Sequence, residues 1–117
     1  MRHKKKPKQL SKKRRANHAM LKNLAVSLIL YEKIKTTQAR AKLARSYVER
    51  LITMAKKGNL ANVRRLYSSI LKKGAVRKLI EEFAPRYKDR AGGYTRIVKL
   101  GKTRKGDGAE LVEINFT

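Results

Sequence analysis

Residues 37–58, TQARAKLARSYVERLITMAKKG, carry the strongest helical pattern of the chain. Their apolar residues recur every three or four positions, the spacing of one buried helix face. These residues are Leu43, Ala44, Tyr47, Val48, Leu51, Ile52 and Ala55. Thr37 suits the N-cap, and Gly58 suits the position that ends a helix in a left-handed conformation. We therefore predict a long helix whose apolar stripe lies in the core.

Two shorter helices are predicted after Gly58. Asn59 can cap the first, and Gly74 offers a stop for it. Its apolar positions are Val63, Leu66, Tyr67 and Ile70. The second helix is marked by Val76, Leu79, Ile80 and Phe83, and Pro85 is expected to terminate it. Because the rings of Tyr47 and Tyr67 lie on apolar stripes, we expect both to pack in the core.

A further helix and a short strand are predicted before these helices, and two strands are predicted after them. Upstream, Leu21, Leu24, Ala25 and Leu28 predict a helix from Met20, and residues 33–36 alternate as a short strand does. Downstream, residues 94–100 and 111–116 read as two strands joined by the polar loop 102–108, with Val112, Ile114 and Phe116 on one face. The prediction is an α+β domain in the order helix, strand, three helices and a two-strand hairpin, with the helices on one face of a small sheet. We assign this single domain to residues 16–117.

The charge is concentrated at the N-terminus. The chain has 32 Lys and Arg against 8 Asp and Glu, a net charge of +24, and nine cations lie between Arg2 and Arg15. Like charges disfavour collapse, so residues 1–15 are predicted to form an extended arm. A tail that only improves solubility is the alternative, but such surfaces usually mix the two signs. Phosphate backbones attract clustered cations by releasing counterions, so nucleic acid is the expected partner.

Several other functions find little support. The chain has no cysteine, and its only histidines, His3 and His18, cannot form a zinc site unaided. Asp107 could be a general base, but an aspartate between two glycines is ordinarily a turn residue. No common catalytic or phosphate-loop motif is present, so we expect no enzyme activity, cofactor, metal or small-molecule substrate. The apolar stretch 24–31 is too short to span a membrane, which needs about 20 residues, and no secretion signal precedes it. We therefore expect an intracellular protein with no membrane partner.

Residues 86–96 can be interpreted in two ways. They place three arginines and two tyrosines around the flexible pair Gly92-Gly93. Guanidinium groups could contact phosphates there while rings stack on unpaired bases. Alternatively, the segment is a loop that leads into a basic strand and places Tyr94 in the core. Composition supports both interpretations almost equally. His3 and His18 are similarly open, since each could contact phosphate or a base or simply be solvent-exposed.

The same segment resembles a known family. Ala91-Gly92-Gly93-Tyr94-Thr95-Arg96-Ile97 with Lys99, preceded by Pro85-Arg86-Tyr87 and Arg90, is similar to the signature of bacterial-type large-subunit ribosomal protein seventeen. Further matches are Met1-Arg2-His3, Leu10, Met20-Leu21, Asn23-Leu24, Ser27-Leu28, Ile34, Thr36-Thr37, Ala39, Ala41, Leu43, Leu51-Ile52-Thr53, Ala55-Lys56 and Gly106-Asp107. The resemblance spans nearly the whole chain, and residues 59–83 match only loosely.

The resemblance implies a two-layer α+β domain that is a structural component of the large ribosomal subunit. It implies binding to ribosomal RNA near the outlet of the peptide exit tunnel, beside neighbouring ribosomal proteins, in a cytoplasmic ribosome. One departure concerns the residues before the first helix. Many members have Ser-Ser-His there, whereas this chain has Arg14-Arg15-Ala16-Asn17. The family's histidine contact is therefore not assigned to His18.

Combining charge and resemblance, we predict three RNA-binding regions. The first comprises Arg2, His3, Lys4, Lys5, Lys6, Lys8, Lys12, Lys13, Arg14 and Arg15, extended by Lys22 and Asn23. The second comprises Arg90, Gly92, Gly93, Tyr94, Arg96 and Lys99, and the third Arg104 and Lys105 at the hairpin tip. A nucleoid-associated, DNA-binding protein remains the alternative, and it would favour duplex DNA.

Overall fold

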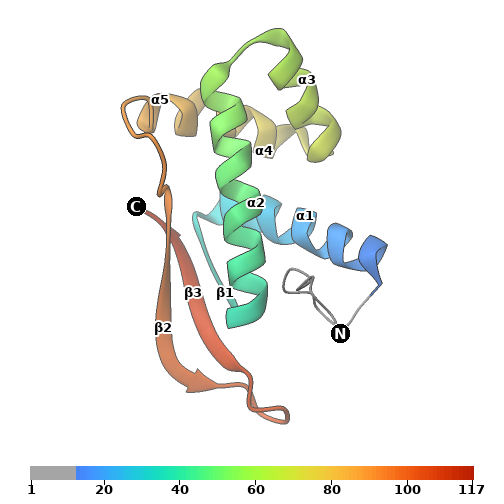
Figure 1. Cartoon of the computed structure of the whole chain (residues 1–117), viewed down its shortest axis with the longest axis vertical. Helices are drawn as coiled ribbons and strands as arrows, with labels where there is room; N and C mark the ends of the chain where they lie inside the picture. The colour runs from blue at the N-terminus through green and yellow to red at the C-terminus, as the bar shows by residue number, and fades with distance from the viewer. Residues whose placement is uncertain (1–12) are drawn as a thin grey trace, which may run out of the picture.

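The computed structural model describes residues 13–117, so the predicted contacts from Arg2 to Lys12 lie outside the described residues. The described chain forms α1 (Arg14–Tyr31), β1 (Lys33–Thr37), α2 (Gln38–Lys57), α3 (Leu60–Ser69), α4 (Lys73–Lys78), the π-helical η1 (Leu79–Phe83), α5 (Ala84–Arg86), β2 (Thr95–Thr103) and β3 (Glu110–Phe116) (Figure 1). The elements α4, η1 and α5 are consecutive and form one continuous helical stretch, so they correspond to a single predicted helix. The predicted α+β class and element order are therefore confirmed.

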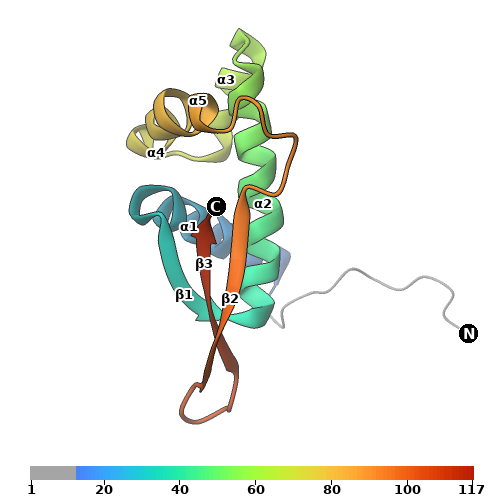
Figure 2. The ribbon, with the colours of Figure 1, turned by 90° about the vertical axis from the view of Figure 1, so that its left-hand side faces the viewer.

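The three strands form one antiparallel sheet in the order β1-β3-β2. Ile114 of β3 lies between Ile34 of β1 and Ile97 of β2 in the register, and Val112 and Ile114 are fully buried. The face predicted for the last strand is thus confirmed. Figure 2 shows the sheet in front with α1 and α2 behind it, so the helices cover one face and leave the other open.

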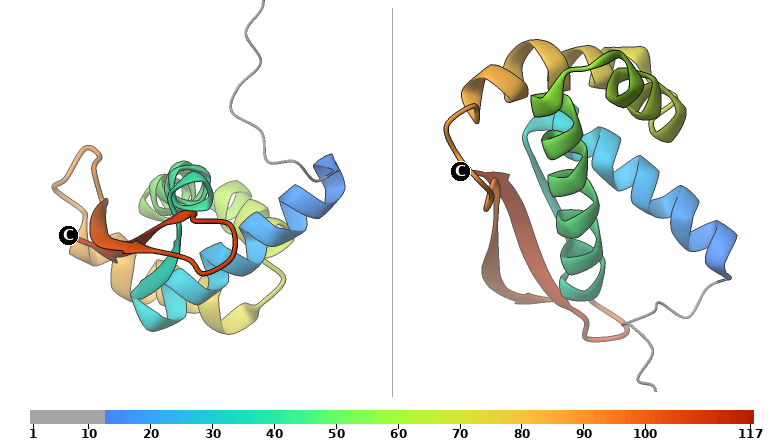
Figure 3. Two further views of the ribbon diagram at one scale, coloured as in Figure 1. Left: turned by 90° about the horizontal axis from the view of Figure 1, so that it is seen from below. Right: turned by 45° about the horizontal axis from the view of Figure 1, so that its top comes forward.

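Helix α2 lies at the centre of the molecule, where it contacts α1, α3, η1, α5 and all three strands (Figure 3). Its buried residues are Ala41, Ala44, Val48, Leu51, Ile52 and Ala55, which share one face. Gly58 ends the helix with a φ of 63°, a left-handed conformation that glycine adopts without steric cost. The Asn59 side chain then accepts a hydrogen bond from the Asn62 amide at 2.9 Å, as a helix N-cap does.

Three local predictions after Gly58 are wrong. Gly74 does not end a helix; α3 ends at Ser69, and Gly74 lies in the first turn of α4. Pro85 does not terminate the next helix either. The wider turn of η1, in which the Ala84 amide bonds to the Leu79 carbonyl, precedes the proline, and helix continues to Arg86. Tyr67 is 42% exposed rather than in the core. Helix α3 contacts α2, and its buried residues are Asn62 and Leu66 instead.

Helix α1 begins earlier than the apolar pattern indicated. It starts at Arg14 rather than near Met20, so Arg14 and Arg15 of the predicted arm are helical residues. The buried residues of α1 are Ala25, Leu28 and Ile29, all in its second half. The first turns leave the core and are exposed (Figure 1), and an exposed helix end needs no apolar periodicity. Arginine and alanine are nevertheless favourable helix formers.

Candidate nucleic-acid interface

The described surface carries a large excess of unpaired positive charge. All eight acidic residues fall within residues 13–117. Only four cations of that part of the chain lie within 4.0 Å of a carboxylate. They are Arg45, Lys78, Arg86 and Arg104. The other described lysines and arginines retain charge that a polyanion can neutralise.

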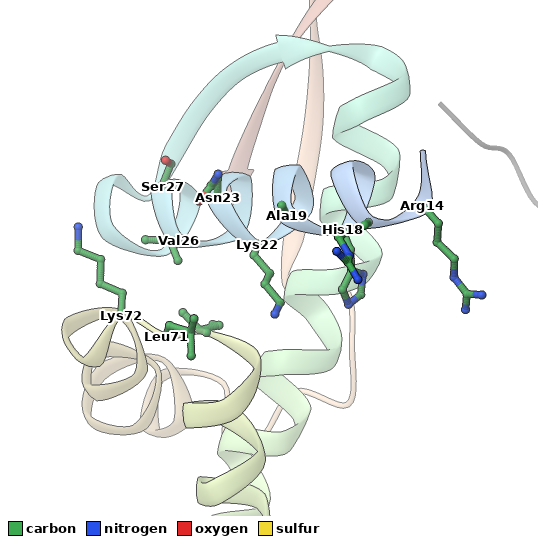
Figure 4. A pocket seen from close by; sticks show the side chains of 11 residues that line it. Arg14, His18, Ala19, Lys22, Asn23, Val26, Ser27, Leu71 and Lys72 are labelled. Carbon is green, nitrogen blue, oxygen red and sulfur yellow. The ribbon is translucent and has the colours of Figure 1, made fainter. Parts of the chain in front are cut away.

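The first predicted region continues from the N-terminal charge block onto α1. Lys13, Arg14, Arg15 and Asn23 are exposed, and Lys22 is half-buried. Lys22 and Val26 point from α1 towards the segment that joins α3 to α4, whereas Asn23 and Ser27 point away on another side of the helix (Figure 4). Between α1 and that segment lies an open groove of about 1340 Å³. His18 at its border is exposed, and its ring meets Tyr47 edge-on at 6.3 Å.

In the second predicted region, Tyr94 belongs to the core. It is 2% exposed, and its ring lies 5.0 Å from the ring of Tyr87. Its hydroxyl donates to the Arg90 carbonyl at 3.2 Å and accepts a hydrogen bond from Lys56 Nζ at 2.9 Å. The prediction that Tyr94 contacts RNA is therefore wrong, because a buried ring cannot stack on a base. The alternative interpretation, Tyr94 in the core, is confirmed.

The arginines of this region have different roles. The Arg86 guanidinium bonds to Glu32 at 2.9 Å and lies 4.7 Å from the centre of the Phe83 ring. Arg90 Nη1 donates to the Gly93 carbonyl at 3.4 Å and to the Thr117 hydroxyl, so Arg90 ties the loop to the end of the chain. Gly92 and Gly93 are exposed beside it, with Gly93 at a φ of 64°. Arg96 alone among the three is exposed without such a contact to another residue in the described chain.

Arg96 and Lys99 do not form one patch. Successive strand residues point to opposite faces, and Arg96 lies on the open face while Lys99, opposite Val112, lies on the face of α2. On the open face Arg96 is opposite Asn115, and Asn115 is in turn opposite Lys33 of β1. Lys33 and Arg96 are both exposed and flank Asn115. The sequence alone did not indicate Lys33, because its neighbour lies more than sixty residues away.

The third predicted region, the hairpin tip, is partly occupied by an ion pair. Arg104 Nε donates to Asp107 Oδ1 at 3.1 Å, and the Ala109 amide donates to the same oxygen at 3.2 Å. These contacts, the Arg104 hydrogen bond first, lower the pKa of Asp107 to about 2. The interpretation of Asp107 as a turn residue is therefore confirmed. Lys105 beside it is exposed and is left to contact a ligand.

Glu49 is a structural residue that the sequence did not reveal. From the middle of α2, its Oε1 accepts hydrogen bonds from the Tyr94 amide at 3.0 Å, the Thr95 amide at 3.4 Å and the Thr95 hydroxyl at 3.3 Å. The carboxylate thus satisfies the backbone where β2 begins and fixes the position from which Arg96 projects. No local signal could identify it, because its partners are 45 and 46 residues away.

The structure does not bring the predicted regions into one site. The start of α1 and the strand β2 lie on opposite sides of α2 in Figures 1 and 3. Within residues 13–117, no group of three or more His, Cys, Asp or Glu side chains is placed to hold a metal ion. The helices described here are each too short or too polar to cross a membrane. What the arrangement offers chemically is dispersed, exposed cationic surface.

Comparison with known proteins agrees with the resemblance noted in the sequence. The family described as Ribosomal protein L17 matches residues 20–117. A Large ribosomal subunit protein bL17 from Hydrogenobaculum sp. is 51% identical over 116 residues, which cover 99% of this chain and 98% of the relative. Relatives of the same description from Pelobacter propionicus and Rickettsia canadensis are 48% and 53% identical, covering 100% and 99% of this chain and 95% and 85% of the relatives. The chain belongs to the ribosomal protein L17 family.

Proposed function

We propose that this protein is a structural constituent of the large ribosomal subunit that binds ribosomal RNA. The observation that carries the proposal is the unneutralised cationic surface of residues 13–117, to which the sequence adds six further cations between Arg2 and Lys12. Membership of the ribosomal protein L17 family supports this role. Its relatives are named as proteins of the large ribosomal subunit.

The mechanism is assembly, with no covalent bond made or broken. Residues 2–15 and the start of α1 contact phosphates, and Lys33 and Arg96 provide a second contact on the open sheet face. Each contact releases a condensed counterion, which is the source of the binding free energy. By family resemblance the site is near the outlet of the peptide exit tunnel, beside neighbouring ribosomal proteins, in the cytoplasm. Helix α2 and the sheet hold these surfaces apart so that they reach separate RNA segments.

The proposal predicts a steep dependence of affinity on salt. Six to ten phosphate contacts cost roughly a thousandfold or more in affinity between 50 and 200 mM salt. Replacing the six Lys and Arg residues of segment 2–12 by Gln should lower the slope of log affinity against log salt by about four to five. The measurement is filter binding to large-subunit ribosomal RNA over a salt series. An unchanged slope would show that this segment does not contact RNA.

The alternative, a DNA-binding protein, is separated by competition. A ribosomal role predicts that ribosomal RNA displaces duplex DNA of equal phosphate concentration, and that the protein sediments with large subunits through a moderate salt wash. Preferential retention of DNA, with release from ribosomal particles, would overturn the proposal. Replacing Ser68 by Gln provides a matched control for handling, because Ser68 is exposed outside the predicted regions and the charge does not change.

A further inference from the structure

The groove between α1 and residues 70–72 combines an apolar floor with a cationic border. Ile70 is 1% exposed and Val26 is half-buried, whereas Leu71, across from Val26, is 83% exposed. Figure 4 shows Val26 and Leu71 on facing segments, with Lys22 pointing into the space between them. An exposed leucine alone needs no explanation. Here, however, it belongs to a concave strip with other apolar side chains, which is the shape of a ligand site.

The border of the groove has one sign of charge. Arg14, Arg15, Lys22 and Lys72 line it together with His18, and no acidic residue does. Within residues 13–117, none of these four cations lies within 4.0 Å of a carboxylate. A ligand that matches this groove is therefore anionic at its edge and apolar over its centre.

We infer that the groove binds an unpaired nucleotide of ribosomal RNA, and this rests on the proposed function. An extruded base has two apolar faces that can lie on Leu71 and Val26, while its flanking phosphates reach Lys22 and Lys72. A duplex would leave the apolar strip unused, because its bases are stacked inside. Residues 1–12 of this chain are poorly suited to fill the groove, since they are themselves cationic.

An RNA occupant is favoured over a protein one by continuity of charge. Arg14 and Arg15 at one end of the groove directly follow the N-terminal cluster of cations that is proposed to bind phosphates. An RNA strand that follows this cluster reaches the groove without crossing an acidic residue of its lining. An acidic protein segment would instead have to compete with RNA for the same cations.

A tryptophan probe tests the inference directly, because the chain has no tryptophan of its own. In the full-length protein, Leu71→Trp places one indole in the groove. Leu60→Trp is the matched control, since Leu60 is 66% exposed at the start of α3 and does not line the groove. Adding large-subunit ribosomal RNA should quench the Leu71→Trp fluorescence strongly and the Leu60→Trp fluorescence weakly. Equal quenching at both positions would overturn the inference.

Affinity measurements separate base contact from charge. Leu71→Ser should weaken binding to ribosomal RNA by roughly fivefold to tenfold without changing the salt slope, the low end of what stacking on an aromatic ring gives, because leucine has no ring. Lys22→Gln should instead lower the slope by about 0.7 to 0.9. Since Leu71 is exposed, Leu71→Ser should leave the thermal unfolding temperature unchanged, which verifies that folding is not the cause.

The outcomes distinguish this inference from the proposed function. Normal affinity of Leu71→Ser for naked ribosomal RNA, with an unchanged fluorescence of Leu71→Trp, would refute the nucleotide site while the salt-dependent binding stands. Loss of Leu71→Ser from assembled subunits, with normal binding to naked RNA, would mean that a protein fills the groove and would also refute it. Failure of the unsubstituted protein to bind ribosomal RNA would refute the proposed function itself.

Discussion

At the scale of single residues, residues 86–96 include side chains that hold the fold and side chains that are exposed to solvent. The Tyr94 hydroxyl donates a hydrogen bond to the Arg90 carbonyl and accepts one from Lys56 of α2. The Glu49 carboxylate accepts hydrogen bonds from the amides of Tyr94 and Thr95. These contacts fix the backbone two residues before Arg96, which reaches solvent. A segment whose composition supported both interpretations almost equally thus contains residues that hold the fold and an arginine that is exposed.

Replacing Tyr94 by Phe should destabilise the fold by about 1 kcal/mol, because the hydroxyl loses its bonds to the Arg90 carbonyl and Lys56. Tyr94→Ala should cost about 3–5 kcal/mol, as expected when a buried aromatic ring is removed. Urea denaturation measures both changes. Folded Tyr94→Phe should bind ribosomal RNA as the unsubstituted protein does. Lost RNA affinity at unchanged stability would mean that the hydroxyl contacts RNA.

Glu32 makes the stability sensitive to acid. Its hydrogen bond from Arg86, opposed in part by burial and assisted by the charge of Lys78, lowers its pKa below the ordinary 4.5. A carboxyl whose pKa is lower in the folded state stabilises the fold above its unfolded pKa, and this is lost as the pH falls through the folded value. The pair is exposed, so the contribution is at most about 1 kcal/mol.

Comparison of Glu32→Gln with the unsubstituted protein measures this contribution. At pH 6 the variant should be less stable in urea, and the difference should shrink between pH 5 and pH 3. A difference that stays constant over this range would show that the carboxylate charge is not its source. The salt bridge with Arg86 should also weaken at high salt, because both side chains are exposed.

At the scale of secondary structure, Gly58 and Gly74 have different roles, although the sequence suggested a helix end at both. Gly58 ends α2 in a left-handed conformation, whereas Gly74 lies inside α4 with nothing within 4 Å of an added Cβ. A Cβ at Gly58 would meet only ordinary contacts, the nearest at 3.8 Å, so its cost there is conformational. The same substitution should therefore have opposite effects at the two positions.

Gly58→Ala should lower the free energy of unfolding by about 1–2 kcal/mol, the cost of a left-handed conformation for a residue with a Cβ. Gly74→Ala should raise it by about 0.5 kcal/mol, because alanine loses less entropy in a helix. Thermal or urea unfolding of the two variants provides the comparison, with each serving as the control for the other. A stabilising Gly58→Ala would contradict the left-handed end of α2.

At the scale of the whole molecule, α2 separates the cationic regions. The start of α1 lies on one side of it and the sheet on the other, as Figure 3 shows. We therefore expect the regions to contact different parts of a large ligand. Lys33 and Arg96, by contrast, flank the same Asn115. We therefore expect them to contact the same phosphate. This arrangement predicts a specific pattern of additivity.

The losses in binding free energy for ribosomal RNA from Lys22→Gln and Arg96→Gln should add in the double variant within about 0.3–0.5 kcal/mol, because distant sites act independently. Lys33→Gln and Arg96→Gln together should cost less than the sum of the single changes. Binding isotherms at one fixed salt concentration measure both cycles. Strong coupling between Lys22 and Arg96 would contradict the separation of the two surfaces. Absence of coupling between Lys33 and Arg96 would contradict their contact with a common phosphate.

The order of elements, the buried stripe of α2 and the cap at Asn59 were all predictable from residues close together in the chain. Helical and strand periodicity place neighbouring side chains on one face whatever the rest of the fold does. The excess of positive charge is likewise a property of composition. It predicted a polyanionic partner, whereas the resemblance of the motifs around Gly92-Gly93 indicated the family.

The burial of Tyr94, the role of Glu49, the exposure of Tyr67 and the pairing of Lys33 with Arg96 across Asn115 depend on residues distant in the sequence. So does the groove beside α1, since Val26 and Leu71 face each other only because α1 packs near the turn between α3 and α4. Local sequence patterns leave several faces of a helix or strand equally suited to burial, and tertiary packing determines which of them is buried. For this reason the tertiary structure alone separated the side chains that hold the fold from those left free to bind.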